Sequence, residues 1–199
     1  DQEMSRGLGD VYKRQEQGYP ARLVVPGWEG NMWVKWIRRL EFGDKPYMTR
    51  EETSKYTDLL TDGKARMFTW VMEAKSVVTS PSPEKPILHK GIQQLRGLAW
   101  SGKGKIKRVD VSLDGGKNWR TAQLHAPIMS KSLVRFTLPF EWSGEELLIQ
   151  SRAIDETGYV QPYIQELQKI RGKNSIYHNN SIATWLVSKS GRVDNVRLG

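Results

Sequence analysis

The chain has 199 residues, of which 38% are hydrophobic, so it can bury a sizeable core in one or two domains. No apolar run approaches the roughly 20 residues that cross a membrane. The absence of cysteine excludes disulfides, thiolate nucleophiles and cysteine-based zinc sites. The formal net charge is +9, but basic residues are dispersed among acidic ones such as Glu51 and Glu52. Nucleic acid is therefore not an expected partner.

Residues 1–15 differ from the rest of the chain. They show little apolar periodicity, begin without methionine, and include the run Gly-Leu-Gly-Asp-Val-Tyr-Lys-Arg-Gln, which is typical of a translated sequencing adapter. We therefore expect a non-native segment here and exclude it from the fold. On this interpretation the chain is a fragment, and its first residues carry no information about export.

A glycine-rich turn within residues 18–36 carries the strongest chemical pattern. Residues 21–25 and 32–40 are apolar runs that predict two strands around the turn. Gly27 and Gly30 would allow positive φ, so that backbone N–H groups in the turn can surround an anion.

Two basic residues flank this turn. Arg22 and Lys35 would supply positive charge to a phosphate-bearing cofactor. The alternative is an ordinary hairpin whose glycines serve the turn and whose basic residues face water. The strand alternation places Val34 and Trp36 toward the core and Trp33 on the opposite face.

A proline-rich segment divides the remaining chain. Residues 16–78 are predicted to be the last portion of a mixed α+β domain, with a weakly helical surface excursion at residues 50–60. Three prolines fall within eight residues of the segment 79–90, which we expect to be an extended linker. Residues 91–199 would form a second domain.

The second domain has the pattern of an antiparallel sandwich. Val109, Val111 and Leu113 alternate with polar residues, as in a strand with one buried face. The expected strands are residues 94–100, 106–113, 119–124, 133–138 and 147–154. The predicted fold is therefore mainly β, with the C-terminal part of an α+β domain followed by an immunoglobulin-like sandwich. Fold alone does not distinguish this from an adhesion or carbohydrate-binding module.

The order of residues in the turn resembles the molybdopterin-binding domain of the sulfite oxidase family. There, a Gly-aromatic-Pro-x-Arg run leads through Val-Pro-Gly-x-x-Gly to x-Val-Lys-Trp. The Gly-Trp-Glu-Gly-Asn version seen here is similar to that of the bacterial molybdenum subunits of Sox sulfite (sulfane) dehydrogenases. The resemblance continues through residues 48–56 and into the family's C-terminal dimerisation domain at residues 98–102, 109–116 and 152–155. It implies a homodimer formed through the β-sandwich.

The resemblance also implies five cofactor contacts. Arg22 matches an arginine that contacts the pterin phosphate. Trp33, Val34 and Lys35 match the three residues after the turn that contact the cofactor. Gln17 takes the place of a histidine in animal sulfite oxidases, a departure that the bacterial Sox type shares.

Arg171, in the closing segment, matches an arginine that helps to hold the sulfite anion beside molybdenum. Bidentate recognition of an oxyanion suits a guanidinium group. The alternative is that Arg171 ends a short helix at Gly172 and lies in solvent. His178 has no second histidine nearby, and we expect it to hydrogen-bond the loop without a catalytic role.

The resemblance implies a molybdenum-molybdopterin enzyme of the periplasm. It would oxidise sulfite or carrier-bound sulfane sulfur and pass electrons to a c-type cytochrome. The cysteine that ligates molybdenum in this family is absent here, so we expect these 199 residues alone to be inactive. Two alternatives are a non-enzymatic β-sandwich module for dimerisation or binding, and the molybdenum domain of a nitrate reductase. Gln17 and the Trp28-Glu29 pair disfavour the nitrate reductase.

Overall fold

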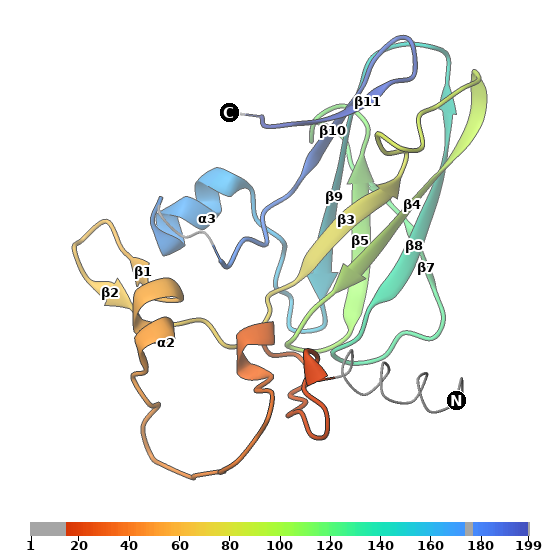
Figure 1. Cartoon of the computed structure of the whole chain (residues 1–199). Helices are drawn as coiled ribbons and strands as arrows, with labels where there is room; N and C mark the ends of the chain where they lie inside the picture. Colours follow the sequence, from red (N-terminus) through yellow and green to blue (C-terminus); the bar gives the residue numbers. More distant parts are fainter. Residues whose placement is uncertain (1–14, 174–176, 199) are drawn as a thin grey trace, which may run out of the picture.

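The computed structural model describes residues 15–173 and 177–198, and its main body is a β-sandwich (Figure 1). Residues 1–14, nearly all of the expected non-native segment, lie outside the described residues. One antiparallel sheet has the order β3 (Lys75–Ser80), β4 (Gly91–Trp100), β8 (Val134–Trp142) and β7 (Gln123–His125). The facing sheet has the order β11 (Val193–Val196), β10 (Thr184–Val187), β9 (Leu147–Asp155), β5 (Ile106–Ser112) and β6 (Arg120–Thr121). The mainly β, immunoglobulin-like fold is thus confirmed.

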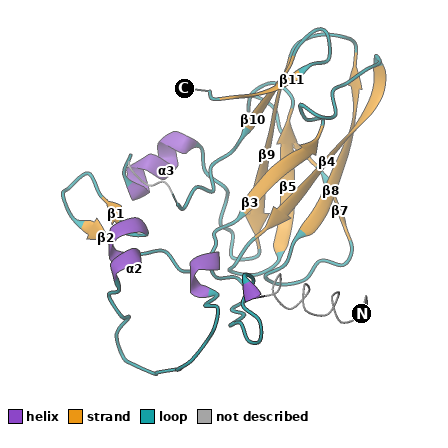
Figure 2. Ribbon diagram, viewed as in Figure 1, coloured by secondary structure: helices purple, strands orange, loops and turns teal. Residues whose placement is uncertain are grey.

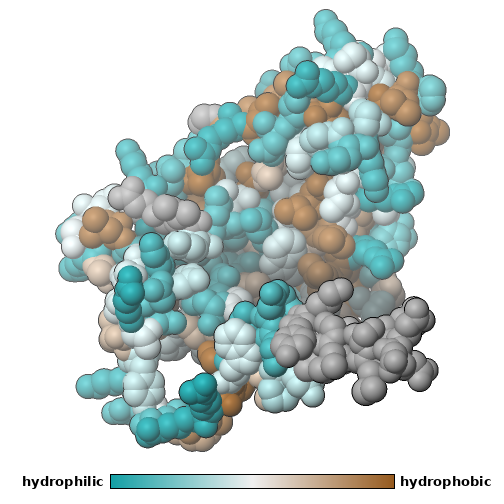
Figure 3. All heavy atoms as spheres, in the orientation of Figure 1, coloured by the Kyte–Doolittle hydropathy of each residue, from teal (hydrophilic) through white to brown (hydrophobic). Residues whose placement is uncertain are grey.

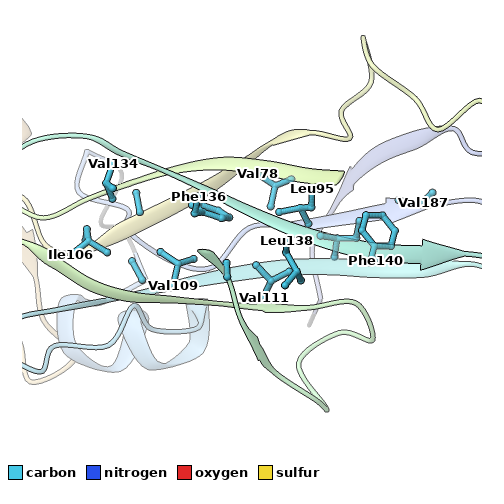
Figure 4. Packing of buried hydrophobic residues seen from close by; sticks show 14 of the residues in the cluster. Val78, Leu95, Ile106, Val109, Val111, Val134, Phe136, Leu138, Phe140 and Val187 are labelled. Carbon is cyan, nitrogen blue, oxygen red and sulfur yellow. The ribbon is translucent and has the colours of Figure 1, made fainter. Parts of the chain in front are cut away.

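The sandwich core follows from the two-residue alternation of its strands. Along β8, Phe136 and Leu138 are buried, whereas Arg135, which precedes Phe136 and points to the other face of the sheet, is exposed. Figure 4 shows these side chains meeting Val109 and Val111 of the opposite sheet. Burying each large apolar side chain contributes about 1.5–3 kcal/mol, so this layer supplies most of the driving force for folding.

The sandwich begins one strand earlier than the sequence suggested. β3 precedes the proline-rich segment, yet it pairs with β4 from Lys75–Trp100 to Ser80–Arg96. Val78 on β3 belongs to the common core. The expected domain boundary at residue 91 is therefore wrong, because the prolines mark a connection between two paired strands and not a linker between domains.

The strand expected at residues 119–124 is divided between the two sheets. β6 pairs with β5, whereas β7 pairs with β8, and the buried Ala122 lies between them. The segment predicted as a single strand therefore crosses from one layer of the sandwich to the other, which periodicity alone does not reveal.

The two strands predicted around the glycine-rich turn do not form. Arg22 and Lys35 make one isolated antiparallel bridge, and the turn contains the short 3-10 helix η1 (Gly30–Met32). Val34 and Trp36, expected in the core, are 52% and 53% exposed. Among the described residues no further strand pairs with this segment, so the local pattern has no sheet to extend.

The residues after the turn form small elements beside the sandwich (Figure 2). Helix α2 (Arg50–Lys55) confirms the expected helical excursion and is followed by a hairpin of β1 (Asp58–Leu59) and β2 (Ala65–Arg66). In Figures 1 and 2, helix α3 (Ile164–Arg171) lies between this hairpin and the sandwich. No helix in the described part of the chain is long and apolar enough to cross a membrane.

Helix α3 positions a buried arginine at its last turn. Its N terminus has a capping interaction in which the Tyr163 backbone N–H donates to the Glu166 carboxylate at 3.1 Å. Leu167 and Arg171, four residues apart, share the buried face of the helix. Gly172 ends the helix with φ of +81°, a conformation that favours glycine.

Candidate functional site

The glycine-rich turn is fixed to one end of the sandwich through main-chain hydrogen bonds. The Met72 N–H donates to the Gly27 carbonyl at 2.9 Å, and the Gly102 N–H donates to the Met72 carbonyl at 2.8 Å. Gly27 has φ of +86°, and a Cβ there would lie 2.5 Å from the Gly102 carbonyl oxygen. The close approach of the turn to the sandwich therefore requires glycine at this position. Gly30, in contrast, lies within η1 and does not have the positive φ expected from the sequence.

The two basic residues of the turn lie side by side. Arg22 and Lys35 face each other in the isolated bridge, and the buried Gly18 packs against both side chains. Arg22 Nη1 donates to the Gln17 carbonyl at 3.3 Å, and Lys35 Nζ donates to the Glu16 carbonyl at 2.7 Å. Neither has a carboxylate partner among the described residues. Both cations are therefore exposed and have remaining donors for an anionic group.

The turn also contains buried polar groups without partners. Trp33 Nε1 and the side-chain amide of Asn31 are buried and have no hydrogen-bond partner within the described residues. Such groups are costly unless a ligand or solvent satisfies them. The exposed cations and these unsatisfied groups fit a phosphate-bearing, hydrogen-bonding cofactor such as molybdopterin. Gln17 and Val34 are exposed near the same bridge, where their carbonyl groups accept hydrogen bonds from Arg22 and from the Leu23 N–H.

Arg171 is buried in an ion-pair network, with only 1% of its surface exposed. Its Nη1 lies 3.2 Å from Asp58 Oδ2 and donates to Thr69 Oγ1 at 2.5 Å. Its Nη2 lies 3.3 Å from Glu73 Oε2. The alternative that placed Arg171 in solvent is therefore wrong. Two carboxylates already balance its charge, so only its Nε remains without a partner in the described part of the chain.

Glu73 connects Arg171 to the glycine-rich turn through His178. His178 Nε2 lies 3.2 Å from Glu73 Oε2, and His178 Nδ1 lies 2.7 Å from Glu29 Oε1 in the turn. Tyr159 Oη also donates to Glu73 Oε2, at 3.1 Å. The hydrogen-bonding role expected for His178 is thus present, and it joins segments that are 149 residues apart.

The charges of the network stabilise one another. Burial would raise the pKa of Glu73, but the hydrogen bond from His178 and the positive charges of Arg171, His178 and Lys103 lower it to about 2. Burial would lower the pKa of His178, but its hydrogen bonds to Glu29 and Glu73 outweigh burial and raise that pKa above its ordinary value. Glu73 is therefore ionised over the whole neutral range, and protonation of His178 is favoured.

The sequence singled out Arg171 and the turn as candidates, but it did not indicate the residues that join them. Asp58, Glu73 and Tyr159 stand in segments with no distinguishing motif, and only the fold brings them together. Within the described residues, no group of three or more His, Cys, Asp or Glu side chains is placed to hold a metal ion.

The fold and site define an immunoglobulin-like β-sandwich with a glycine-rich turn attached at one end, where Arg22 and Lys35 are exposed. A family model described as the Mo-co oxidoreductase dimerisation domain matches residues 66–185, which is more than half of the chain. A second, described as the oxidoreductase molybdopterin binding domain, matches residues 13–51. The chain belongs to the Mo-co oxidoreductase dimerisation domain family.

Individual relatives agree with this assignment. The chain is 33% identical over 162 residues to the sulfite oxidase of Gallus gallus, covering 74% of this chain and 35% of that protein. It is 31% identical over 179 residues to nitrate reductase [NADH] 2 of Nicotiana tabacum, covering 74% of this chain and 19% of that protein. The solved structure of the sulfane dehydrogenase SoxCD from Paracoccus pantotrophus matches with 63% identity and a TM-score of 0.89. That match covers 94% of this chain and 48% of that chain, so this chain spans about half or less of the relatives it matches.

Proposed function

We propose that the chain is part of a molybdenum-cofactor dehydrogenase that oxidises sulfite or carrier-bound sulfane sulfur. The juxtaposition of Arg22 and Lys35 over Gly18, with no carboxylate partner in the described part of the chain, is the observation that carries this proposal. The family membership and the 63% identity to a sulfane dehydrogenase support it. The similarity to nitrate reductases is weaker, at 31% identity.

The residues of the turn would anchor the cofactor. Arg22 and Lys35 would bind its phosphate, and Trp33 would donate its unsatisfied indole N–H. Val34 and Gln17 would complete the contact surface. When bound, the cofactor would supply two-electron redox chemistry, in which sulfite and water yield sulfate, two protons and two electrons. The electrons would pass to a c-type cytochrome, and the enzyme would act in the periplasm.

Arg171 would hold the anionic substrate. Asp58 and Glu73 occupy the two Nη atoms of Arg171, so the remaining Nε would make the contact. Glu73 would also keep the guanidinium group in place. The role of the protein is thus to bind, orient and neutralise charge, as expected where a cofactor carries the redox chemistry.

The sandwich would pair two copies of the chain. The outer face of the β3-β4-β8-β7 sheet carries a groove of about 890 Å³ that includes Leu98, Met129 and Leu133. Ile92, on the same face of β4, is 84% exposed. Apolar side chains exposed together on a sheet are typical of an interaction surface, and Figure 3 shows hydrophobic residues gathered over the sandwich.

The cofactor role can be tested in a chimaera in which this chain replaces the matching part of the Paracoccus pantotrophus sulfane dehydrogenase. We expect Arg22→Met and Lys35→Met to lower the bound pterin by about tenfold at limiting cofactor, because each removes a charge-assisted phosphate contact. Arg38→Met and Lys45→Met, which neutralise exposed cations outside the bridge, are the matched controls. Equal pterin content in all four variants would contradict the assignment.

A further inference from the structure

A cavity of about 270 Å³ lies between the outermost strands of the two sheets. β3 ends one sheet and β11 ends the other, and residues of both strands line the cavity. The start of α3 and residues 179–183 complete its wall. Arg171 stands at the other end of α3 and does not line this cavity. The cavity is therefore distinct from the residues proposed to hold cofactor and substrate.

Two cations line the cavity, Lys75 on β3 and Arg197 directly after β11. Lys75 is partly exposed and Arg197 is exposed, so both are accessible to a ligand. Lys75 Nζ donates to the Asn179 carbonyl and keeps two further N–H groups. Burial lowers the pKa of Lys75, and the charge of Glu29, which does not line this cavity, only partly opposes that.

The lining of the cavity contains no aspartate or glutamate. Neither Lys75 nor Arg197 forms an ion pair within the described residues. The cavity therefore has an excess of positive charge, which favours an anion. The carboxylates nearest to the lining residues in sequence have other partners: Glu73 pairs with Arg171, Glu166 accepts from the Tyr163 N–H, and Asp194 pairs with Arg192.

Buried polar side chains form the floor of the cavity. Gln150 is 1% exposed, and its Nε2 donates to Oγ1 of the buried Thr184 at 2.8 Å. Asn195 Nδ2 donates to the Thr184 carbonyl at 3.2 Å. These bonds fix the floor, whereas the donors that a ligand meets are on the accessible Lys75, Asn195 and Arg197.

The wall formed by residues 179–183 is also held in place. The Ile182 N–H donates to the Pro162 carbonyl at 2.9 Å, and Gln161 Nε2 donates to the Ser181 carbonyl at 3.2 Å. Because the wall is ordered before a ligand arrives, little conformational entropy is lost there on binding.

Apolar side chains make up much of the remaining lining. Leu198, next to Arg197, is 37% exposed. The free energy gained on burying apolar surface grows with its area, so a ligand with an apolar part would bind more tightly than a bare anion. The apolar lining residues are Val77, Ile164, Ile182, Ala183, Val196 and Leu198.

We propose that this cavity binds a carboxylate at the end of a short apolar chain, with Lys75 and Arg197 as the residues that bind the carboxylate. Arginine offers a planar fork to the two carboxylate oxygens, and lysine adds a point charge. A short free acid has this chemistry, and so does the C-terminus of a peptide, which could extend along the free edge of β11. The proposal goes beyond the proposed function and does not rest on it, because no cofactor or substrate residue takes part.

The test is titration of the ¹⁵N-labelled 199-residue chain with hexanoate at constant ionic strength, followed through the amide signals of Ile164, Ala183 and Val196. Acetate lacks the apolar chain, and hexanamide lacks the charge. We expect hexanoate to shift these signals saturably and to bind at least about tenfold more tightly than either comparison compound. Unmoved signals, or equal affinities for the three compounds, would overturn the proposal.

A dipeptide distinguishes the two sources of the carboxylate. N-acetyl-valyl-leucine carries a free carboxylate at the end of an extended main chain. Tighter binding of this dipeptide than of hexanoate would identify the end of a peptide as the ligand, and tighter binding of hexanoate would identify a free acid. Either order supports the site.

Arg197→Met and Lys75→Met should each weaken hexanoate binding about tenfold, because each removes one charge-assisted contact. Arg197 is exposed near the end of the chain, so its variant keeps the test valid even if Lys75→Met destabilises the fold. Arg38→Met and Lys107→Met, at exposed positions that do not line the cavity, are the matched controls and should bind hexanoate like the unaltered chain. The same affinity in Arg197→Met and in the controls would contradict the site. Binding that depends on Arg197 would support it even if the chimaera bound no pterin.

Discussion

Glu73 Oε2 and Arg171 Nη2 lie 3.3 Å apart, although the two residues are separated by 98 positions in the chain. Both side chains are largely buried, and the pair joins the segment before β3 to the last turn of α3. Through His178 the same carboxylate reaches the glycine-rich turn. This pair therefore connects the β-sandwich with the residues proposed to hold the cofactor.

Glu73→Gln should destabilise the chain strongly. The substitution keeps the shape but leaves Arg171, His178 and Lys103 without a shared negative charge, and removing one partner of a buried ion pair costs about 3–5 kcal/mol. The free energy of unfolding in urea is the measurement. Glu141→Gln, an exposed site on β8, should change it by less than about 0.5 kcal/mol. Equal effects of the two substitutions would show that the network contributes nothing.

The free energy of unfolding should decrease on both sides of weakly acidic pH, as the pH falls and as it rises. The pKa of Glu73 is lowered to about 2, so its contribution is present above its ordinary value of 4.5 and is lost as pH falls from there toward 2. The pKa of His178 is raised above 6.5, so its contribution is full below 6.5 and is lost as pH rises through the folded-state value. The contribution of this network should therefore be greatest between about pH 4.5 and 6.5.

Thermal unfolding from pH 3 to pH 9 measures this dependence. His178→Gln should remove the part of the profile that declines above pH 6.5, and it should also reduce the acidic decline, because the hydrogen bond and charge of His178 help to lower the pKa of Glu73. An unchanged alkaline decline in this variant would mean that other groups cause it.

Gly27→Ala should weaken the attachment of the turn to the sandwich. The new Cβ would meet the Gly102 carbonyl oxygen at 2.5 Å, and alanine resists the φ of +86°. We expect a loss of about 1–3 kcal/mol in the free energy of unfolding. Gly30→Ala is the matched control, because nothing lies within 4 Å of the added Cβ and its φ is not positive. A smaller loss at Gly27 than at Gly30 would be incompatible with this geometry.

Ile92→Glu should weaken self-association if the outer face of the β3-β4-β8-β7 sheet pairs two copies. A charge in place of an 84% exposed apolar side chain would be desolvated at that interface, and we expect the dissociation constant to rise at least about tenfold. Sedimentation velocity over a concentration series measures it. Ile170→Glu changes another exposed isoleucine, on α3, and should leave the association unchanged. If Ile170→Glu weakens self-association and Ile92→Glu does not, the interface would instead be a surface that includes α3.

The sandwich could be predicted because its strands carry their own pattern. β8 alternates buried with more exposed residues along its nine residues, and β5 carries the alternating apolar residues Val109 and Val111, although the polar Asp110 and Ser112 are buried as well. β3 was missed as the first strand because Pro81, Pro83 and Pro86 follow it. These prolines disfavour helix and strand in their own segment, but they do not show whether the flanking segments belong to one domain or two.

The failures elsewhere come from contacts between distant segments. The runs around the glycine-rich turn contain strand-forming residues, yet among the described residues the one main-chain hydrogen bond that joins the two runs is from the Leu23 N–H to the Val34 carbonyl, at 3.0 Å. A strand needs neighbours along its whole length, and the local sequence does not specify them. The fold also brings together Glu29, Glu73 and His178, which are far apart in the sequence. No spacing in the sequence could therefore have indicated this network.

The central proposal is tested most directly by measuring molybdenum content and sulfite-dependent cytochrome c reduction. Both are measured on the 199-residue chain and on the chimaera with the Paracoccus pantotrophus cofactor half. The chain alone has no cysteine to ligate molybdenum, so we expect neither metal nor activity from it. The chimaera should contain stoichiometric molybdenum and should reduce cytochrome c when sulfite is added. A folded chimaera without molybdenum and without activity would contradict the enzymatic account and leave the sandwich as a module for association or binding.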